Sequence, residues 1–223
     1  MSDELRVCID RLPPPKTPGG RLALIKANCW QGGEAIAISF MDGQPALWDR
    51  VKTHARTWQK YTNLSLFFRQ TDDTQIRISF KQKGSWSHIG TACRTVPKNE
   101  PTMNFGWLTP ESSDDEVRRV VLHEFGHALA CIHEHQNPAG GIKWNKQAVY
   151  DYFSGEPNYW TKEQIDHNLL ETYDKDMTAF TKLDPKSIMM YPIDRRLTED
   201  GLEVGWNRDL SDTDKDFIFE MYP

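Results

Sequence analysis

Three histidines and a glutamate in one short stretch carry the residue types of a hydrolytic metal site. His123 and His127 are four positions apart, so on a helix both imidazoles project from one face and can bind one metal ion. Glu124 lies beside them, where its carboxylate can take a proton from a metal-bound water. His133 offers a third nitrogen, and three protein ligands plus one water form the catalytic type of zinc site. The pattern therefore predicts a hydrolase with one catalytic Zn²⁺ ion.

The position of His133 requires the helix to end soon after His127. On a straight helix, His133 would lie about 15 Å along the axis from His123 and would point away from the shared face. One zinc ion, with Zn–N distances of about 2.0–2.1 Å, cannot reach both. The chain must therefore reverse between His127 and His133, and glycine in a left-handed conformation is the usual residue at such a helix end.

With these residues the chain resembles the metzincin metalloendopeptidases, whose pattern is H-E-x-x-H-x-x-G-x-x-H. Ala130 stands at the glycine position of that pattern. Alanine in a left-handed conformation costs roughly 1–2 kcal/mol. Either the fold absorbs this strain or the helix ends by a different local path, and the ligand set is the same in both cases.

A second segment, residues 187–191, resembles the Met-turn of the metzincins, in which a methionine forms an apolar floor under the zinc. Met189 stands at that position. The nearest likeness is to the astacins, which carry a glutamate directly after the third histidine, matched by Glu134, and a tyrosine two residues after the methionine, matched by Tyr191. The resemblance implies that Tyr191 binds zinc as a fifth ligand and swings away to stabilise the tetrahedral intermediate.

The expected elements favour an α+β fold, because strands and helices mix without regular βαβ alternation. Strands are expected at 34–41, 64–68, 76–80 and 103–107, and helices at 45–61, from Asp114 through the histidine motif, and at 146–153, 161–173 and 211–221. The resemblance implies a metzincin-type two-lobed zinc peptidase with a twisted mixed sheet, a backing helix and an active-site helix.

We expect two parts in the chain. Residues 1–20 form an N-terminal extension with a short strand at 5–10 and a Pro/Gly linker at 13–20. Residues 21–223 form a single metalloprotease catalytic domain, with an upper lobe at about 21–133 and a lower lobe at about 134–223.

Composition excludes several other classes of protein. The 223 residues carry a net charge of −5 without a basic stripe, so nucleic acid is not an expected partner, and no apolar run approaches the length of a membrane span. We expect a monomer. Residues 1–5 are acidic and show no apolar segment of a signal peptide, so the expected location is cytoplasmic by default, or outside the cell by a non-classical route. Mostly reduced thiols are then expected for the four cysteines.

The expected substrate is a protein or peptide that lies extended along an edge strand between Gly84 and Phe105. Residues just after Tyr191 should wall the side-chain pocket on the leaving-group side. Arg195 and Arg196 fall there, and a basic wall would favour acidic substrate residues. Two exposed arginines in a loop are the simpler explanation of the same residues.

Cys8 and Asp10 raise the hypothesis of latency. A thiolate or carboxylate near the N-terminus can take the open zinc position, as pro-segments do in related families. A short strand with a buried cysteine is the simpler interpretation.

Two other interpretations of the motif remain open from the sequence. The first is a zinc-containing peptide-binding module with little or no hydrolysis, although such a module has no need for a base at Glu124. The second is a carboxylate third ligand, Glu163 or Glu171, which the spacing of His133 makes unnecessary.

Overall fold

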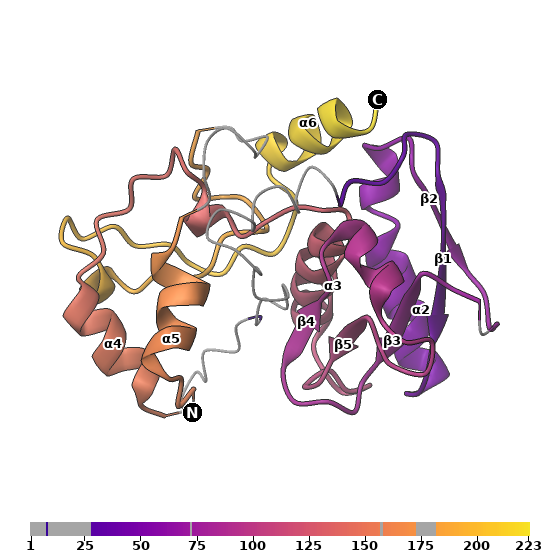
Figure 1. Cartoon of the computed structure of the whole chain (residues 1–223), viewed down its shortest axis with the longest axis horizontal. Coiled ribbons are helices and arrows are strands. Elements are labelled where there is room, and N and C mark those ends of the chain that lie inside the picture. Colours follow the sequence, from indigo (N-terminus) through magenta and orange to yellow (C-terminus); the bar gives the residue numbers. More distant parts are fainter. Residues whose placement is uncertain (1–7, 9–27, 72, 157, 173–181) are drawn as a thin grey trace.

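A computed structural model describes residue 8 and residues 28–71, 73–156, 158–172 and 182–223 (Figure 1). Of the expected features, Asp10, the linker at 13–20 and the strand at 5–10, apart from Cys8, lie outside the described residues. No helix in the described part is long and apolar enough to cross a bilayer. No disulfide bond links the four cysteines, all of which are described.

One mixed sheet of five strands fills the first half of the molecule. Its strands are β1 (Ala35–Phe40), β2 (Ser65–Phe68), β3 (Ile76–Ser79), β4 (Ser85–Ser87) and β5 (Met103–Phe105). Their order is β2-β1-β3-β5-β4, and all neighbours pair in parallel except β4, which runs antiparallel to β5 at the end of the sheet. This sheet confirms the predicted α+β class with a mixed sheet. The expected strands at 34–41, 64–68, 76–80 and 103–107 all form, whereas β4 was expected only as an edge strand somewhere between Gly84 and Phe105, without bounds of its own.

Two helices pack on the apolar face of the sheet. They are α2 (Pro45–Ala55), the predicted backing helix, and α3 (Asp114–Ala128), which carries the histidine motif. Ser113 caps α3 by accepting a hydrogen bond from the backbone of Glu116, and acidic residues in its first turn suit the positive end of the helix dipole. The prediction that the first helix reaches residue 61 was wrong. The chain turns inward after Ala55, and the Trp58 indole donates to the carbonyl oxygen of Leu122.

The second half of the chain is mostly irregular and contains three α-helices among the described residues: α4 (Lys146–Ser154), α5 (Lys162–Ile165) and α6 (Asp212–Met221). The regular α-helix expected at 161–173 covers only Lys162–Ile165, because a π-helical turn, Asp166–Leu170, follows α5 directly. In this turn the carbonyl oxygen of Asn168 lies 2.7 Å from Nε2 of His135 and is therefore directed toward the segment after His133.

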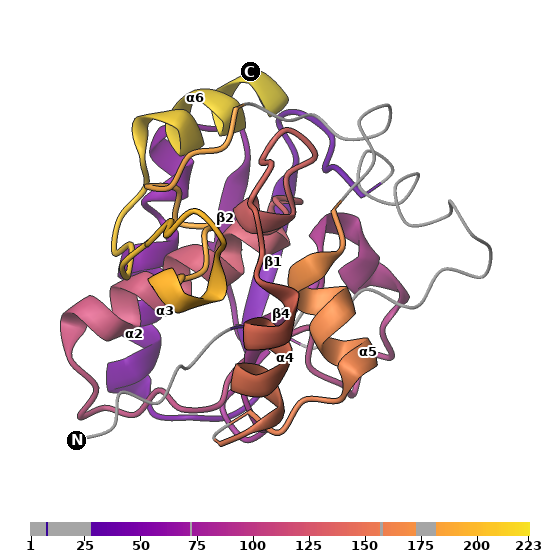
Figure 2. The same cartoon turned by 90° about the vertical axis from the view of Figure 1, so that its left-hand side faces the viewer.

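Two apolar cores meet at residues 187–191. The first core lies between the sheet and α2 and α3, and the last helix, α6, returns to pack against it through Ile218. The second core lies around α4 and α5, on the far side of α3 from most of the sheet (Figures 1 and 2). Met189 belongs to the first core and Met190 to the second, so residues 187–191 connect the two.

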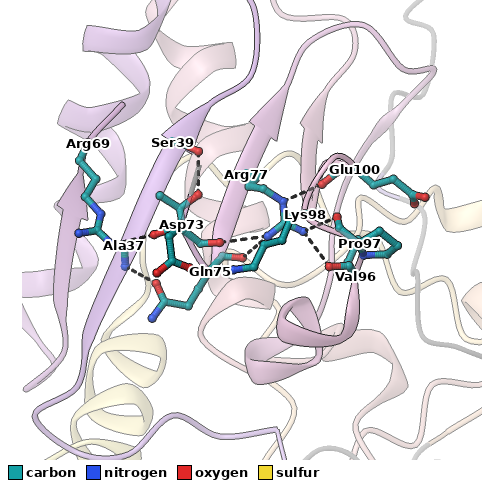
Figure 3. A network of polar contacts seen from close by, with 11 residues as sticks. Ala37, Ser39, Arg69, Asp73, Gln75, Arg77, Val96, Pro97, Lys98 and Glu100 are labelled. Atoms are coloured by element: carbon teal, nitrogen blue, oxygen red, sulfur yellow. Dashed lines mark hydrogen bonds and ion pairs between the residues drawn. The ribbon is translucent and has the colours of Figure 1, made fainter. Parts of the chain in front are cut away.

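Arg77 ties together the loops on the opposite, polar face of the sheet (Figure 3). Arg77 is only 3% exposed, and its guanidinium donates to five backbone carbonyl oxygens, four of them at 2.8–3.2 Å and one at 3.5 Å. The four nearer acceptors belong to Thr74, Val96, Pro97 and Glu100, and the fifth belongs to Gln75. One buried cation thereby fixes the loop before β3 and the loop that leads into β5, and with them the edge of the sheet.

The end of α3 produces the chain reversal that His133 requires. Ala130 adopts a positive φ of 74°, and two hydrogen bonds close the turn: its own N–H donates to the carbonyl of His127, and the N–H of Cys131 donates to that of Gly126. This is the Schellman arrangement, in which glycine is usual at the position of Ala130. The fold therefore absorbs the strain of left-handed alanine.

We predict that Arg77→Met lowers the free energy of unfolding by about 3 kcal/mol, because several buried or partly buried carbonyl oxygens lose a hydrogen bond from the guanidinium. Denaturant unfolding measures the change. Arg208→Met is the matched control: the Arg208 side chain is 63% exposed and pairs with Asp115 at the surface, so the expected change is within about 0.5 kcal/mol. Equal effects of the two substitutions would contradict the anchoring role of Arg77.

We predict that Ala130→Gly raises the free energy of unfolding by about 0.5–1 kcal/mol. Glycine removes the left-handed strain of roughly 1–2 kcal/mol. Part of this gain is lost, because glycine also raises the conformational entropy of the unfolded chain. The corresponding rise in Tm is about 1–4 °C, measurable by calorimetry. A drop in Tm would show that the buried Cβ of Ala130 contributes more than the strain costs.

Candidate metal centre

The three predicted histidine ligands converge. His123 and His127 project from one face of α3, and the turn at Ala130 brings His133 back to them. Nε2 of His127 lies 3.0 Å from Nε2 of His133, and one ligand atom from each of the three rings lies within 4.8 Å of the others. Two nitrogens bound to one tetrahedral zinc ion are about 3.3 Å apart, given Zn–N distances near 2.05 Å. The three rings therefore fit a single zinc ion.

Backbone carbonyls orient two of the rings. Nδ1 of His123 lies 2.8 Å from the carbonyl oxygen of Ile188, and Nδ1 of His127 lies 2.9 Å from that of Cys131. An Nδ1–H that donates to a carbonyl leaves the Nε2 lone pair for a metal. Nε2 of His123 is buried and makes no hydrogen bond in the described part of the chain, which is the state expected of a ligand atom.

Burial keeps the rings in the form that binds metal. It lowers the pKa of His123 and of His133 well below the ordinary value for histidine, and the neighbouring His127 lowers both further. Neutral imidazole is the ligand form, since protonation would occupy the lone pair. The site is therefore set for a cation near neutral pH.

Met189 packs directly beneath the active-site helix. A Cβ added to Gly126 would lie 2.3 Å from the sulfur of Met189, so only glycine at this position permits the contact. Gly126 is next to His127, and the sulfur therefore lies under the helical turn that carries the ligands.

Asp214 fixes the Met-turn from the final helix, a role that the sequence analysis missed. Its carboxylate accepts hydrogen bonds from Oγ of Ser187 at 2.6 Å and from the N–H of Ile188 at 2.8 Å. The same side chain also forms the capping box with Ser211. The sequence indicates only the capping role of Asp214. Its contacts with Ser187 and Ile188 depend on how α6 packs against the core, which local sequence does not show.

Glu134 connects the third ligand to the Met-turn. Its Oε1 accepts from the Asn137 amide at 3.0 Å and from the N–H of Asp184 at 2.9 Å, and its own N–H donates to the carbonyl of Met189. Burial raises the pKa of this carboxyl to about 7. The buried hydrogen bonds thereby hold the segment that carries His133 against residues 187–191.

Cys8 lies inside the metal centre. Its thiol is buried and donates to Oε2 of Glu124 at 3.3 Å. Together with the three histidines it forms a group of four potential ligands within 4.8 Å of one another. The backbone carbonyl of Cys8 accepts a hydrogen bond from the hydroxyl of Tyr191. One residue from the N-terminal extension therefore contacts the ligand cluster, Glu124 and Tyr191 together.

Tyr191 packs against the ligand rings. Its ring centroid lies 4.5 Å from that of His133 and 4.3 Å from that of His135, and its side chain is buried. Its hydroxyl reaches the position where Cys8 lies.

A small cavity adjoins the ligand cluster and Glu124. Cys8, Arg119 and Trp206 are among its lining residues, whereas Arg195 and Arg196 are not. The two arginines begin a short 3₁₀ turn, where Arg196 is 74% exposed and pairs with Asp194 at 2.6 Å. The carboxylates weighed as alternative ligands, Glu163 and Glu171, are not part of the group around the histidines.

Comparisons with known proteins give the family. No family model matches the chain. A structure of myroilysin is 44% identical over 89% of this chain and 97% of that chain, with a TM-score of 0.88. A crystal structure of myroilysin is 40% identical over 99% and 92% of the two chains, with a TM-score of 0.71.

A more distant structure shares the fold. High choriolytic enzyme 1, a hatching enzyme zinc-protease from the medaka fish Oryzias latipes, is 15% identical over 86% of this chain and 93% of that chain, with a TM-score of 0.59. The extended identity with myroilysin and the three converging histidines show that this chain belongs to the astacin-like zinc metalloendopeptidases of the metzincin group.

Proposed function

We propose that this zinc endopeptidase hydrolyses peptide bonds with Glu124 as general base and Tyr191 as hydrogen-bond donor to the developing oxyanion. The observation that carries the proposal is the position of Glu124. Its Oε2 lies 3.3 Å from Sγ of Cys8, and that sulfur lies within 4.8 Å of a ring nitrogen of each of the three histidines. A carboxylate this near the fourth ligand position is within reach of a water bound there.

Each group then has a defined task. His123, His127 and His133 would hold the zinc ion, which would polarise the scissile carbonyl and lower the pKa of a water ligand to near 7. Oε2 of Glu124 would accept a proton from the attacking water, and the same carboxyl would pass it to the leaving amine. Tyr191 donates its hydroxyl proton in a hydrogen bond to the oxyanion, and Met189 supports the ligands from below.

The sheet edge supports an extended substrate. Strand β4 is the last strand of the sheet in the described part of the chain, and it lies against α3. A peptide can pair its backbone with this edge as an added strand, which brings its scissile bond past the histidines. We propose a monomeric enzyme for protein or peptide substrates, without nucleic-acid or membrane partners.

We also propose that residues 1–20 are an inhibitory extension in front of a single catalytic domain at 21–223. Cys8 supports this proposal by three contacts made at the same time. Its sulfur lies among the three histidines, where a fourth ligand would bind, and its thiol donates a hydrogen bond to Glu124. Its backbone carbonyl accepts a hydrogen bond from the hydroxyl of Tyr191. A substrate needs all three groups. The unmodified chain is therefore latent until Cys8 leaves the site.

We predict that full-length Cys8→Ala hydrolyses casein at least tenfold faster than the unmodified chain, because the catalytic groups become accessible. Cys93→Ala is the control, since Cys93 is buried in the first core away from the ligand cluster. A second readout is independent of activity. The cobalt-substituted protein should show a thiolate-to-metal charge-transfer band that Cys8→Ala removes and Cys93→Ala keeps. An unchanged band in Cys8→Ala, or an unchanged rate, contradicts latency through this residue.

We predict that Glu124→Ala, introduced into the Cys8→Ala chain, retains one zinc per molecule and loses casein hydrolysis by about 10²–10⁴-fold, since only the base is removed. Elemental analysis and casein cleavage measure the two quantities. Zinc in both chains with hydrolysis in neither would favour the peptide-binding module instead.

A further inference from the structure

The cavity beside Glu124 has an aromatic wall that the zinc chemistry does not use. Besides His123 and Tyr191, its lining includes six apolar or aromatic residues: Trp107, Val120, Ile188, Met190, Pro192 and Trp206. Because Glu124 also lines the cavity and delivers the proton to the leaving amine, the cavity lies on the leaving-group side of the scissile bond.

A chain of contacts locks the two indoles in place. Nε1 of Trp107 donates to Oε1 of Glu116 at 2.9 Å. Arg119 binds the same carboxylate through both Nε and Nη2, at 3.0 and 2.8 Å. The guanidinium of Arg119 then lies 4.1 Å from the ring centroid of Trp206, within the range of a cation–π contact. Trp107, Glu116, Arg119 and Trp206 thus form one connected group, which we call the indole clamp.

The indole clamp joins elements that are far apart in the sequence. Glu116 and Arg119 lie on α3, on the face that carries His123 one turn later, and Trp107 follows β5. Trp206 belongs to the segment before α6, where the neighbouring Asn207 donates to the carbonyls of Pro185 and Ser187, both at 2.8 Å. The Met-turn therefore positions the second indole relative to the ligands.

The charge of Arg119 is already balanced by Glu116. A bidentate carboxylate pair uses the guanidinium in its own plane, and the indole of Trp206 covers one of its faces. An acidic substrate side chain would have to compete with Glu116 and would also approach Glu124. The electrostatics of the clamp therefore do not favour an acidic residue.

We infer that the cavity receives the side chain of the substrate residue that follows the scissile bond, and that the indole clamp selects a large apolar side chain there, aromatic above all. The inference rests on the proposed endopeptidase function. Two indoles offer flat apolar walls, on which aromatic rings stack with more contact than small side chains do. Only about 20 Å³ of the cavity remains beside Cys8, room for about one water molecule, so the substrate side chain enters after Cys8 has left.

The test uses the full-length Cys8→Ala chain and peptides that differ only in the residue after the scissile bond: Phe, Leu, Ala, Asp or Lys. We expect kcat/KM for Phe and Leu to exceed that for Ala by at least tenfold, with Asp below Ala. Trp206→Ala and Arg119→Gln should each reduce the Phe/Ala ratio by about tenfold, whereas Trp206→Phe should retain most of it. A preference for Asp, or a ratio that both substitutions leave unchanged, overturns the inference and leaves the endopeptidase function intact.

A matched control exists in the same chain. Arg94 pairs with Glu34 and lies 4.9 Å from the ring of Trp30, the same trio of residue types away from the cavity. Arg94→Gln should leave the Phe/Ala ratio unchanged. Thermal unfolding of all variants separates a loss of preference from a loss of folding.

If no peptide is cleaved, the proposed endopeptidase function has failed, and a binding measurement then tests the side-chain preference by itself. Peptides with Phe or Ala at the tested position are titrated into Cys8→Ala/Glu124→Ala, and tryptophan fluorescence is followed. The inference predicts at least tenfold tighter binding of the Phe peptide, and loss of that difference when Trp206→Ala is added. Equal binding of the two peptides overturns it.

Discussion

The convergence of three buried imidazoles on one point is the constraint on which the rest of the structure depends. A rigid helix can supply only two of them, because further ligands on the same helix are too far along its axis. The third comes from a chain reversal at Ala130, whose φ of 74° is unfavourable for any residue with a Cβ. Among the described residues, Nε2 of the buried His123 has no hydrogen-bond partner, and a cation bound there would satisfy it.

The second half of the chain serves that convergence by fixing the ligands from below. Gly126 has no side chain, so Met189 lies directly against the helical turn that carries His127. Asp214 holds Ser187 and Ile188, and the carbonyl of Ile188 in turn orients His123. A helix from the end of the chain thus acts on a metal ligand through only one intervening residue. The two apolar cores meet where this connection runs, so the metal centre lies at their boundary.

Local patterns were sufficient to predict the parts of the molecule that local physics determines. The helical spacing of His123 and His127 appears as expected, and so do the strands at 64–68 and 76–80, which the alternation of apolar residues predicts. Failures occurred where distant contacts override local preference. The first helix ends early because Trp58 turns toward Leu122, and α5 gives way to a wide turn whose Asn168 carbonyl faces His135.

The same distinction applies to the site. The ligands are encoded within a few positions of one another, and their spacing alone required the reversal at Ala130. Cys8 acts on Glu124 across 116 positions of sequence, so its presence in the site was a hypothesis that spacing alone was unable to decide. Asp214 and Arg119 each have a local explanation: Asp214 caps a helix, and Arg119 pairs with Glu116 three positions earlier on the same helix. Their contacts with Ile188 and Trp206 depend on the complete fold.

The proposed latency and the proposed substrate selection depend on the same volume. Cys8 lines the cavity of the indole clamp and also contacts Glu124, so this one residue occupies part of the side-chain pocket as well as the space beside the reactive groups. A peptide that displaced Cys8 from the metal position alone would still find the side-chain cavity partly filled by Cys8. A large apolar side chain gains its contacts only once Cys8 has moved, so such a side chain favours the open state in proportion to its own binding energy. If both proposals hold, the indole clamp links the choice of substrate to the departure of Cys8, because a residue too small to contact both indoles gains little from opening the site.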